Sequence, residues 1–190
     1  MAKVATAEKR SNRTLLTRRI AYTAVLTAII AVTSQIAFHL PSGIPVTLQT
    51  FSVALSGYFG GIWGVAAVFI YLLLGLVGVP VFAYFKGGFS AIVGVTGGYL
   101  VGFIPMAIIS AIPVRVKNNA LRHTLKLFLG LVGLAFCHLF GALWFGYTSG
   151  SGVERAFAVA SLPYLVKDVA SVFGGYVLSE ILKKRLKASL

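Results

Sequence analysis

The chain has 190 residues, of which 58% are hydrophobic and only 11% are charged, and its net charge is +13. Residues 20–85 contain no charged side chain at all. A hydrocarbon layer about 30 Å thick is crossed by about 20 helical residues, so this apolar run is long enough for several crossings. The composition therefore excludes a soluble globular protein and indicates an integral membrane protein, with one membrane domain over residues 1–190.

Turn-forming residues divide the apolar sequence into predicted transmembrane helices. Prolines and glycines interrupt the first run at 41–45, 60–61 and 78–80, and polar stretches separate the later runs. The predicted spans are residues 20–40, 46–60, 61–79, 93–112, 126–147 and 162–182. The fold class is therefore an all-α membrane bundle of six helices. The second span is short for a full crossing, so we expect it either to tilt strongly or to cross incompletely.

The basic residues indicate how the chain is oriented. All but three of the 17 lie in three clusters: Lys3, Lys9, Arg10, Arg13, Arg18 and Arg19; Arg115, Lys117, Arg122 and Lys126; Lys183, Lys184, Arg185 and Lys187. The positive-inside rule assigns such clusters to the cytoplasmic face. Six spans place both termini and the loop at 113–125 on that face. We therefore predict a multi-pass protein of the bacterial cytoplasmic (plasma) membrane, N-in and C-in. Membrane topology accounts for the net charge, so nucleic acid is not an expected partner.

Motifs of covalent catalysis are missing from the sequence. It contains no phosphate-binding loop of the G-x-x-x-x-G-K-[ST] type and no H-E-x-x-H motif. His39, His123 and His138 are too scattered for metal-ligand spacing, and the four acidic residues form no close pair. Cys137 is the only cysteine, and we interpret it as a buried thiol. We therefore predict no metal site, no cofactor and no enzymatic activity, and we expect binding or transport instead.

Asp168 is the side chain that most strongly indicates a binding site. It falls inside the last predicted span, where an acidic residue costs about 2.5–3.5 kcal/mol and usually faces an internal cavity. Its neighbour Lys167 points about 100° away on a helix, so we do not expect the two to face each other. The alternative is that Lys167 reaches outward and Asp168 makes only a structural pair. Gln49, just inside the outer boundary, either hydrogen-bonds a ligand or ties a loop to a helix.

A run of small residues marks the fourth predicted span. Gly94, Gly98 and Gly102 repeat at four-residue intervals and would lie on one helix face. Such spacing favours close approach of a neighbouring helix. It also leaves room for a ligand, beside the hydroxyl groups of Thr96 and Tyr99.

The first predicted span carries a comparable stripe of alanines, at Ala21, Ala24, Ala28 and Ala31. The stripe either packs inside the chain or forms a docking face for another membrane subunit. Periodicity alone leaves both interpretations open.

The order of these motifs resembles the BioY family, the biotin-specific substrate-binding (S) components of energy-coupling-factor (ECF) transporters. The matching segments are GIPVTLQT at 43–50, YLLLGLVGVPVFA at 71–83, the glycine pair at 87–88 and TGGYLVGF at 96–103, followed by an acidic residue at Asp168. The resemblance implies an S-component fold with biotin bound near the outer face, and it implies a membrane coupling subunit and two cytoplasmic ATPases as partners. In such a complex, Ala24 and Ala28 would contact the coupling subunit.

Biotin offers a ureido group, an apolar thioether ring and a carboxylate tail. We expect polar and aromatic side chains near the outer face to bind it: Asp168, Lys167, Gln49, Tyr84, Lys86, Thr96 and Tyr99. Asp168 would accept the ureido N–H groups, and Gln49 or Thr96 would serve the carbonyl. The two tyrosines would flank the ring, and one of the two lysines would neutralise the tail.

Two other functions stay open from the sequence. Members of the family commonly have asparagine, proline and lysine where this chain has Tyr84, Val95 and Ser171. These departures favour an S component for another vitamin or small carboxylic acid. A stand-alone secondary transporter with Asp168 as its proton relay is less well supported, because the chain is short and has no detectable repeat.

Overall fold

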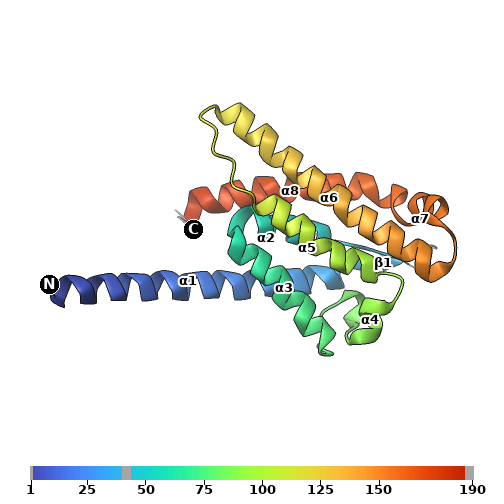
Figure 1. Cartoon of the computed structure of the whole chain (residues 1–190), viewed down its shortest axis with the longest axis horizontal. Helices are drawn as coiled ribbons and strands as arrows, with labels where there is room; N and C mark the ends of the chain where they lie inside the picture. The colour runs from blue at the N-terminus through green and yellow to red at the C-terminus, as the bar shows by residue number, and fades with distance from the viewer. Residues whose placement is uncertain (1, 40–43, 187–190) are drawn as a thin grey trace.

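The computed structural model describes residues 2–39 and 44–186, with side chains for 13–38 and 44–186. It is a helical bundle with a short hairpin at one end (Figure 1). Its elements are α1 (Ala2–Gln35), β1 (Ala37–His39), β2 (Pro45–Thr47), α2 (Gln49–Gly60), α3 (Ile62–Leu76), η1 (Ala83–Phe85), α4 (Phe89–Val93), α5 (Gly97–Ala111), α6 (Asn119–Ser149), α7 (Val153–Ala160) and α8 (Leu162–Leu186).

Each predicted span overlaps a helix, but several predicted ends were wrong. The first span was predicted to reach residue 40, whereas α1 ends at Gln35 because β1 pairs with β2 in an antiparallel hairpin. The second span begins at Gln49 for the same reason. Residues 148–161, which separate the fifth and sixth predicted spans, contain a helix, α7. Residues 40–43 of the first span and its outer turn lie outside the described residues, as does Lys187 of the C-terminal cluster.

Length separates the helices that can cross a membrane unaided from those that cannot. In the described part of the chain, Arg13–Gln35 and Asn119–Ser149 are long and apolar enough. The pair α7 and α8, bent by 55°, adds a third candidate if it counts as one span. The 12-residue α2 extends only about 18 Å along its axis, and α5 contains 15 residues. By length, then, the structure supports two or three spans, fewer than the six predicted.

Glycines allow α5 to pack closely along α6. A Cβ atom at Gly102 would lie 2.8 Å from the Cα of Cys137, and one at Gly98 would lie 2.3 Å from the Cβ of Trp144. The packing interpretation of the glycine stripe therefore holds at these two positions. Placing Gly94 on the same helix was wrong, because the chain breaks between α4 and α5. The carbonyl oxygen of Gly94 instead accepts a 2.8 Å hydrogen bond from the Trp144 indole N–H.

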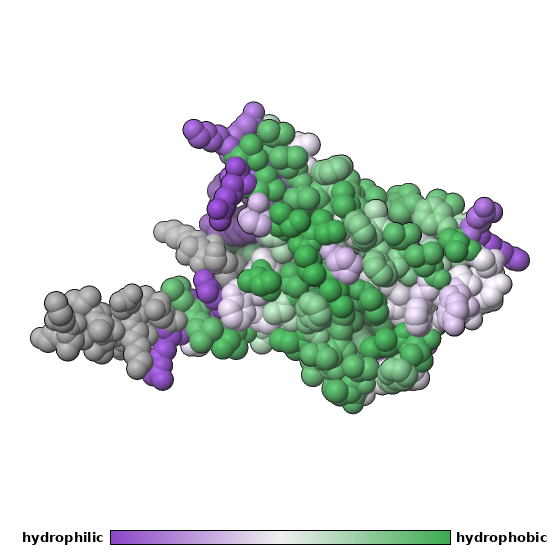
Figure 2. Space-filling view, in the orientation of Figure 1, coloured by the Kyte–Doolittle hydropathy of each residue, from purple (hydrophilic) through white to green (hydrophobic). Residues whose placement is uncertain are grey.

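The surface is apolar in the middle and hydrophilic at the ends of the long axis (Figure 2). Large apolar side chains such as Ile62, Phe128 and Val166 are well exposed. In water, continuous apolar surface of this kind would cause aggregation, so it indicates a lipid-facing belt. The start of α1, the 112–118 loop and the end of α8 lie at one end of the molecule (Figure 1). The three basic clusters of the sequence therefore belong to the same end.

Candidate functional site

A cavity of about 630 Å³ lies at the end of the bundle opposite the termini. Its walls come from β2, the 82–87 segment, the neighbouring ends of α2, α5 and α8, and the middle of α6. Its volume falls within the range of about 300–1,000 Å³ that small-molecule sites occupy. All seven predicted ligand-binding residues line it: Gln49, Tyr84, Lys86, Thr96, Tyr99, Lys167 and Asp168. Residues separated by more than a hundred positions in sequence thus share one chamber.

Asp168 lies on the cavity wall, on α8, and is only 5% exposed. Its Oδ1 atom accepts a hydrogen bond from the Lys167 ammonium, and its Oδ2 atom lies 3.2 Å from Nε2 of His138. A buried carboxylate is tolerated only when partners compensate its lost hydration, and these two groups provide that compensation. The acid therefore has the setting expected of a ligand site, with protein partners on one side and the cavity on the other.

Lys167 contacts Asp168 directly, so the prediction that the two side chains do not face each other was wrong. The 100° rule describes where side chains leave the helix, but the four-carbon stem of lysine bends far enough to bring its ammonium back. The same ammonium donates a 2.8 Å hydrogen bond to the Thr47 carbonyl on β2. Lys167 thus joins α8 to the hairpin and holds one oxygen of the acid.

His138 is the member of the site that the sequence did not identify. It projects from the middle of α6, lines the cavity and is 3% exposed. The available signal was a polar side chain inside the uncharged run at 127–153. Among the residues that the structure describes, no three His, Cys, Asp or Glu side chains gather as metal ligands. The contact between His138 and Asp168 is therefore a polar pair without a third metal-binding partner.

Gln49 lines the cavity and also ties the hairpin to the bundle. Its Oε1 atom accepts a 2.9 Å hydrogen bond from the Thr47 hydroxyl, and its Nε2 atom donates a 2.5 Å bond to the Tyr71 hydroxyl. An amide nitrogen has two hydrogens, so one N–H remains after the bond to Tyr71. The structural role is therefore present, and the geometry leaves capacity for a ligand contact.

Tyr99 and Thr96 contribute differently from one another. The Tyr99 hydroxyl donates a 2.5 Å hydrogen bond to the Ala160 carbonyl and lies 3.1 Å from the Ser161 hydroxyl, at the break between α7 and α8. Tyr99 therefore offers the cavity its ring rather than its hydroxyl. Thr96 precedes the first turn of α5, and within the described ranges its hydroxyl makes no hydrogen bond to the protein. It is the better hydrogen-bonding candidate of the two.

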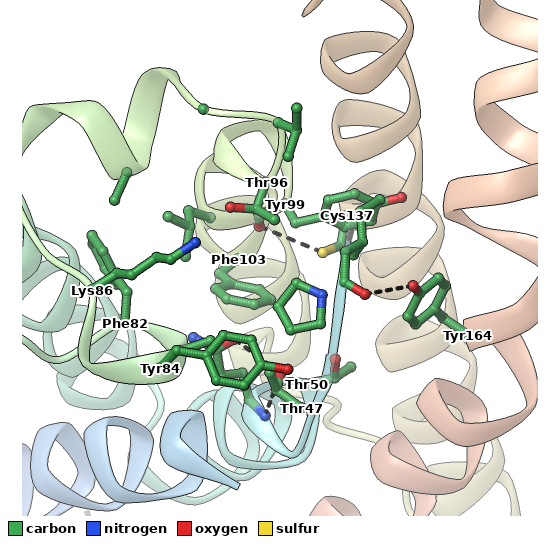
Figure 3. A pocket seen from close by; sticks show the side chains of 18 of the residues that line it. Thr47, Thr50, Phe82, Tyr84, Lys86, Thr96, Tyr99, Phe103, Cys137 and Tyr164 are labelled. Atoms are coloured by element: carbon green, nitrogen blue, oxygen red, sulfur yellow. Dashed lines mark hydrogen bonds between the residues drawn. The ribbon is translucent and has the colours of Figure 1, made fainter. Parts of the chain in front are cut away.

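The 82–87 segment forms the opposite wall of the cavity, and Figure 3 shows the side chains of Tyr84 and Lys86 directed from it toward α5 and α6. Tyr84 and Phe85 have positive φ angles of 60° and 55°, an unfavourable conformation for residues with a Cβ atom. Gln35 at the end of α1 holds this turn. Its Nε2 atom donates to the Phe82 carbonyl at 3.1 Å, and its Oε1 atom accepts from the Phe85 amide at 2.9 Å.

Ala24 and Ala28, the predicted docking residues, lie far from this chamber on α1. Both are exposed, whereas Thr23 and Thr27 on the adjacent face are buried and donate hydrogen bonds to the α3 carbonyls of Trp63 and Ala67. The hydroxyl groups therefore serve the packing of α1 on α3. The alanine face is left uncovered by the described residues.

Comparison with known proteins gives a consistent result. The family model described as the BioY family matches residues 5–188. A probable biotin transporter BioY of Pyrococcus horikoshii is 33% identical over 87% of this chain and 96% of its own length. The biotin transporter BioY of Thermotoga maritima is 34% identical over 88% of this chain and 96% of its own. A crystal structure of the S component for biotin from an ECF-type ABC transporter superposes with a TM-score of 0.79 at 21% identity. The superposed region covers 90% of this chain and 93% of the chain in the crystal structure, which shows that the two share a fold.

Proposed function

The chain belongs to the BioY family, and we propose that it is the substrate-binding subunit of an ECF-type importer that captures biotin from outside the cell. The observation that carries the proposal is Asp168, a buried carboxylate on the wall of a chamber of ligand size. Such a group is costly inside a membrane bundle, and a ligand with hydrogen-bond donors gives it a function.

The acceptor capacity of Asp168 fits a cyclic urea. A carboxylate has about four lone-pair positions. The Lys167 ammonium takes one on Oδ1, Nε2 of His138 lies 3.2 Å from Oδ2, and the Thr50 hydroxyl also hydrogen-bonds to the carboxylate. The acceptor capacity that remains, on the wall of the chamber, is proposed for the two N–H donors of the ureido ring. A planar ligand edge with two parallel N–H groups is thus the complement of this carboxylate.

The carboxylate tail of biotin is assigned to Lys86 rather than Lys167. The charge of Lys167 is already paired with Asp168, and a second of its three N–H donors bonds to the Thr47 carbonyl. Lys86 is an exposed residue of the 82–87 segment, and its side chain points into the same chamber (Figure 3). Its ammonium has no hydrogen-bond or ion-pair partner within 44–186 and 13–39. The site therefore has an acceptor at its inner end and a cation near its mouth.

Aromatic side chains supply the surface for the apolar thioether ring. Tyr84, Tyr99 and Phe103 line the chamber from two opposite walls (Figure 3). Rings of this kind bury a large apolar area at small entropic cost. The free hydroxyl of Thr96 and the remaining N–H of Gln49 are the donors proposed for the ureido carbonyl.

The six-span topology with both termini inside belongs to the same proposal. The start of α1, the 112–118 loop and the end of α8 share one end of the bundle, as the positive-inside rule requires of cytoplasmic segments (Figure 1). The chamber then opens at the outer face. The short α2 and α3 would cross with local thinning of the bilayer.

Transport would depend on a coupling subunit and two cytoplasmic ATPases, and we propose that this chain is not itself an enzyme. The exposed alanines of α1 are the proposed contact with the coupling subunit, since small side chains let a partner helix approach closely within a bilayer.

Calorimetric titration of the purified protein in detergent tests the function. Biotin is expected to bind saturably at one site, whereas lipoic acid should bind at least a hundredfold more weakly. Lipoic acid is the matched ligand, because it keeps a sulfur-containing ring and a carboxylate tail but lacks the ureido donors. Equal affinity for the two ligands would contradict the assignment of Asp168 as the acceptor of the ureido N–H groups. Absence of biotin binding, together with saturable binding of another vitamin, would assign a different S-component substrate.

A further inference from the structure

His138 occupies a position where an imidazole is difficult to accommodate. It lies in the middle of α6 within an uncharged run, and it is 3% exposed. A buried polar group lowers stability unless its hydrogen-bonding atoms find partners. Only one of its two nitrogens has a polar atom of the protein nearby, namely Nε2, which lies 3.2 Å from Oδ2 of Asp168. Both nitrogens are buried and neither makes a well-aligned hydrogen bond among the described residues, so the approach of Nε2 to the acid is a close polar contact.

This asymmetry indicates what the ring does. A histidine that serves only packing or fold stability is expected to satisfy both nitrogens or to be replaced by an apolar residue. Here the ring is held edge-on by Tyr99, with centroids 5.9 Å apart and planes at 87°, so its orientation is fixed without a bond at Nδ1. A carboxylate only accepts hydrogen bonds, so Nε2 carries the hydrogen in the neutral ring. The polar contact that the ring makes is the 3.2 Å approach of Nε2 to Oδ2 of Asp168.

We propose that His138 is a positioning residue of the biotin site, which acts on the ligand through Asp168. The inference rests on the proposed function of the chamber. Lys167 bonds to Oδ1 and His138 contacts Oδ2 at 3.2 Å, so a protein group restrains the carboxylate at each oxygen. The carboxylate then keeps the direction toward the ligand that a planar pair of N–H donors requires.

Lys167 and His138, which both contact the carboxylate, differ in their other contacts. The ammonium of Lys167 also bonds to the Thr47 carbonyl, so it has a second role in joining α8 to β2. The imidazole has no polar contact other than Asp168 among the described residues, so its loss should change the acid alone. Substitution of His138 therefore tests the positioning of Asp168 without disturbing the fold.

A matched pair of amide variants tests the role of Nε2. In His138→Gln the side-chain amide reaches the former Nε2 position and still donates to Asp168. In His138→Asn the shorter amide lies near the former Nδ1 position and does not. We expect biotin affinity within about threefold of the parent for His138→Gln and about tenfold weaker for His138→Asn, the order of one hydrogen bond.

A double-mutant cycle tests whether the effect passes through Asp168. His138→Leu is expected to weaken biotin about tenfold in the parent protein but less than about twofold when Asp168→Asn is already present. The thermal unfolding midpoint without ligand should be unchanged or higher in His138→Leu, because an unpartnered nitrogen is removed.

The outcomes separate the two proposals. If the parent protein binds no biotin, the proposed function fails. If the parent binds biotin and His138→Leu binds equally well, the positioning role fails while the function stands. A tenfold loss that persists in the Asp168→Asn background would also overturn the inference, because it would show that the imidazole acts independently of the acid. Equal weakening by the Gln and Asn variants would overturn the assignment to Nε2.

Discussion

Replacing Asp168 by asparagine is the most informative single change, because it keeps the shape of the side chain and removes its charge. A hydrogen bond to a charged group contributes about 1.5–3 kcal/mol and a neutral one about 0.5–1.5 kcal/mol. With two ureido N–H groups donating to the carboxylate, the loss is about 2–3 kcal/mol, or about 30- to 150-fold in affinity. The asparagine NH₂ group would also face a ligand donor, which places the expected loss at the upper part of that range.

Isothermal titration with biotin measures this loss directly. The fold should survive, since Lys167 keeps its bond to the Thr47 carbonyl, and the thermal midpoint without ligand checks this. Glu180→Gln is the matched control on the same helix, because Glu180 pairs with Lys183 at 3.0 Å near the other end of α8. The control should bind biotin like the parent protein. An Asp168→Asn variant that binds biotin within threefold of the parent would refute the reasoning, since the acid would then be structural only.

Further predictions follow from the mouth of the cavity and from the packing of α1 and α5. Lys86→Gln should weaken biotin binding by up to about fivefold, since exposed ion pairs contribute about 0–1 kcal/mol. The binding of biotinamide, which lacks the tail charge, should not change. Equal weakening of both ligands would contradict the assignment of Lys86 to the carboxylate tail. Gln35→Ala removes both hydrogen bonds to the 82–87 turn, so biotin should dissociate faster in stopped-flow measurements, and an unchanged rate would show that the turn needs no tether. Gly98→Val should lower the thermal midpoint, because overpacking costs about 1–3 kcal/mol, and a normal midpoint would show that α5 can shift away from α6. Replacing Ala24 and Ala28 together by leucine should prevent co-purification of the coupling subunit without changing biotin affinity; intact co-purification would place the docking face elsewhere.

The sequence predicted the class of the protein because membrane insertion imposes strong compositional rules. The uncharged run at 20–85 and the three basic clusters follow from the cost of charge in a bilayer. The ends of the helices were less predictable. The hairpin of β1 and β2 ends α1 at Gln35, and it depends on pairing between residues that no local periodicity reveals. Likewise, α7 folds between the fifth and sixth predicted spans, where no helix was predicted.

Residues of the candidate site were predictable where a polar side chain falls inside a predicted transmembrane span. Asp168 and Gln49 stand out for that reason, and the structure places both on the cavity wall. His138 was not assigned a role, because a neutral imidazole carries no charge signal and its partner lies thirty positions further along the chain. The contact of Lys167 with Asp168 was missed because helix geometry fixes the direction of Cβ but leaves a long side chain free to bend.

Other parts of the site depend on backbone geometry rather than on residue type. Lys86 and Tyr84 reach the cavity through a turn with two consecutive positive φ angles, which Gln35 stabilises from another element. The commitment of the Tyr99 hydroxyl to Ala160 likewise depends on how α7 meets α8. Such long-range relations are fixed by tertiary packing, so sequence alone could name these residues but could not divide their roles.

The most direct test is an experimental structure of the protein with biotin bound. The account predicts both ureido nitrogens at about 2.7–3.2 Å from the two oxygens of Asp168, with His138 still in contact with Oδ2. A biotin ring bound elsewhere in the chamber, with the carboxylate contacting only protein groups, would contradict it.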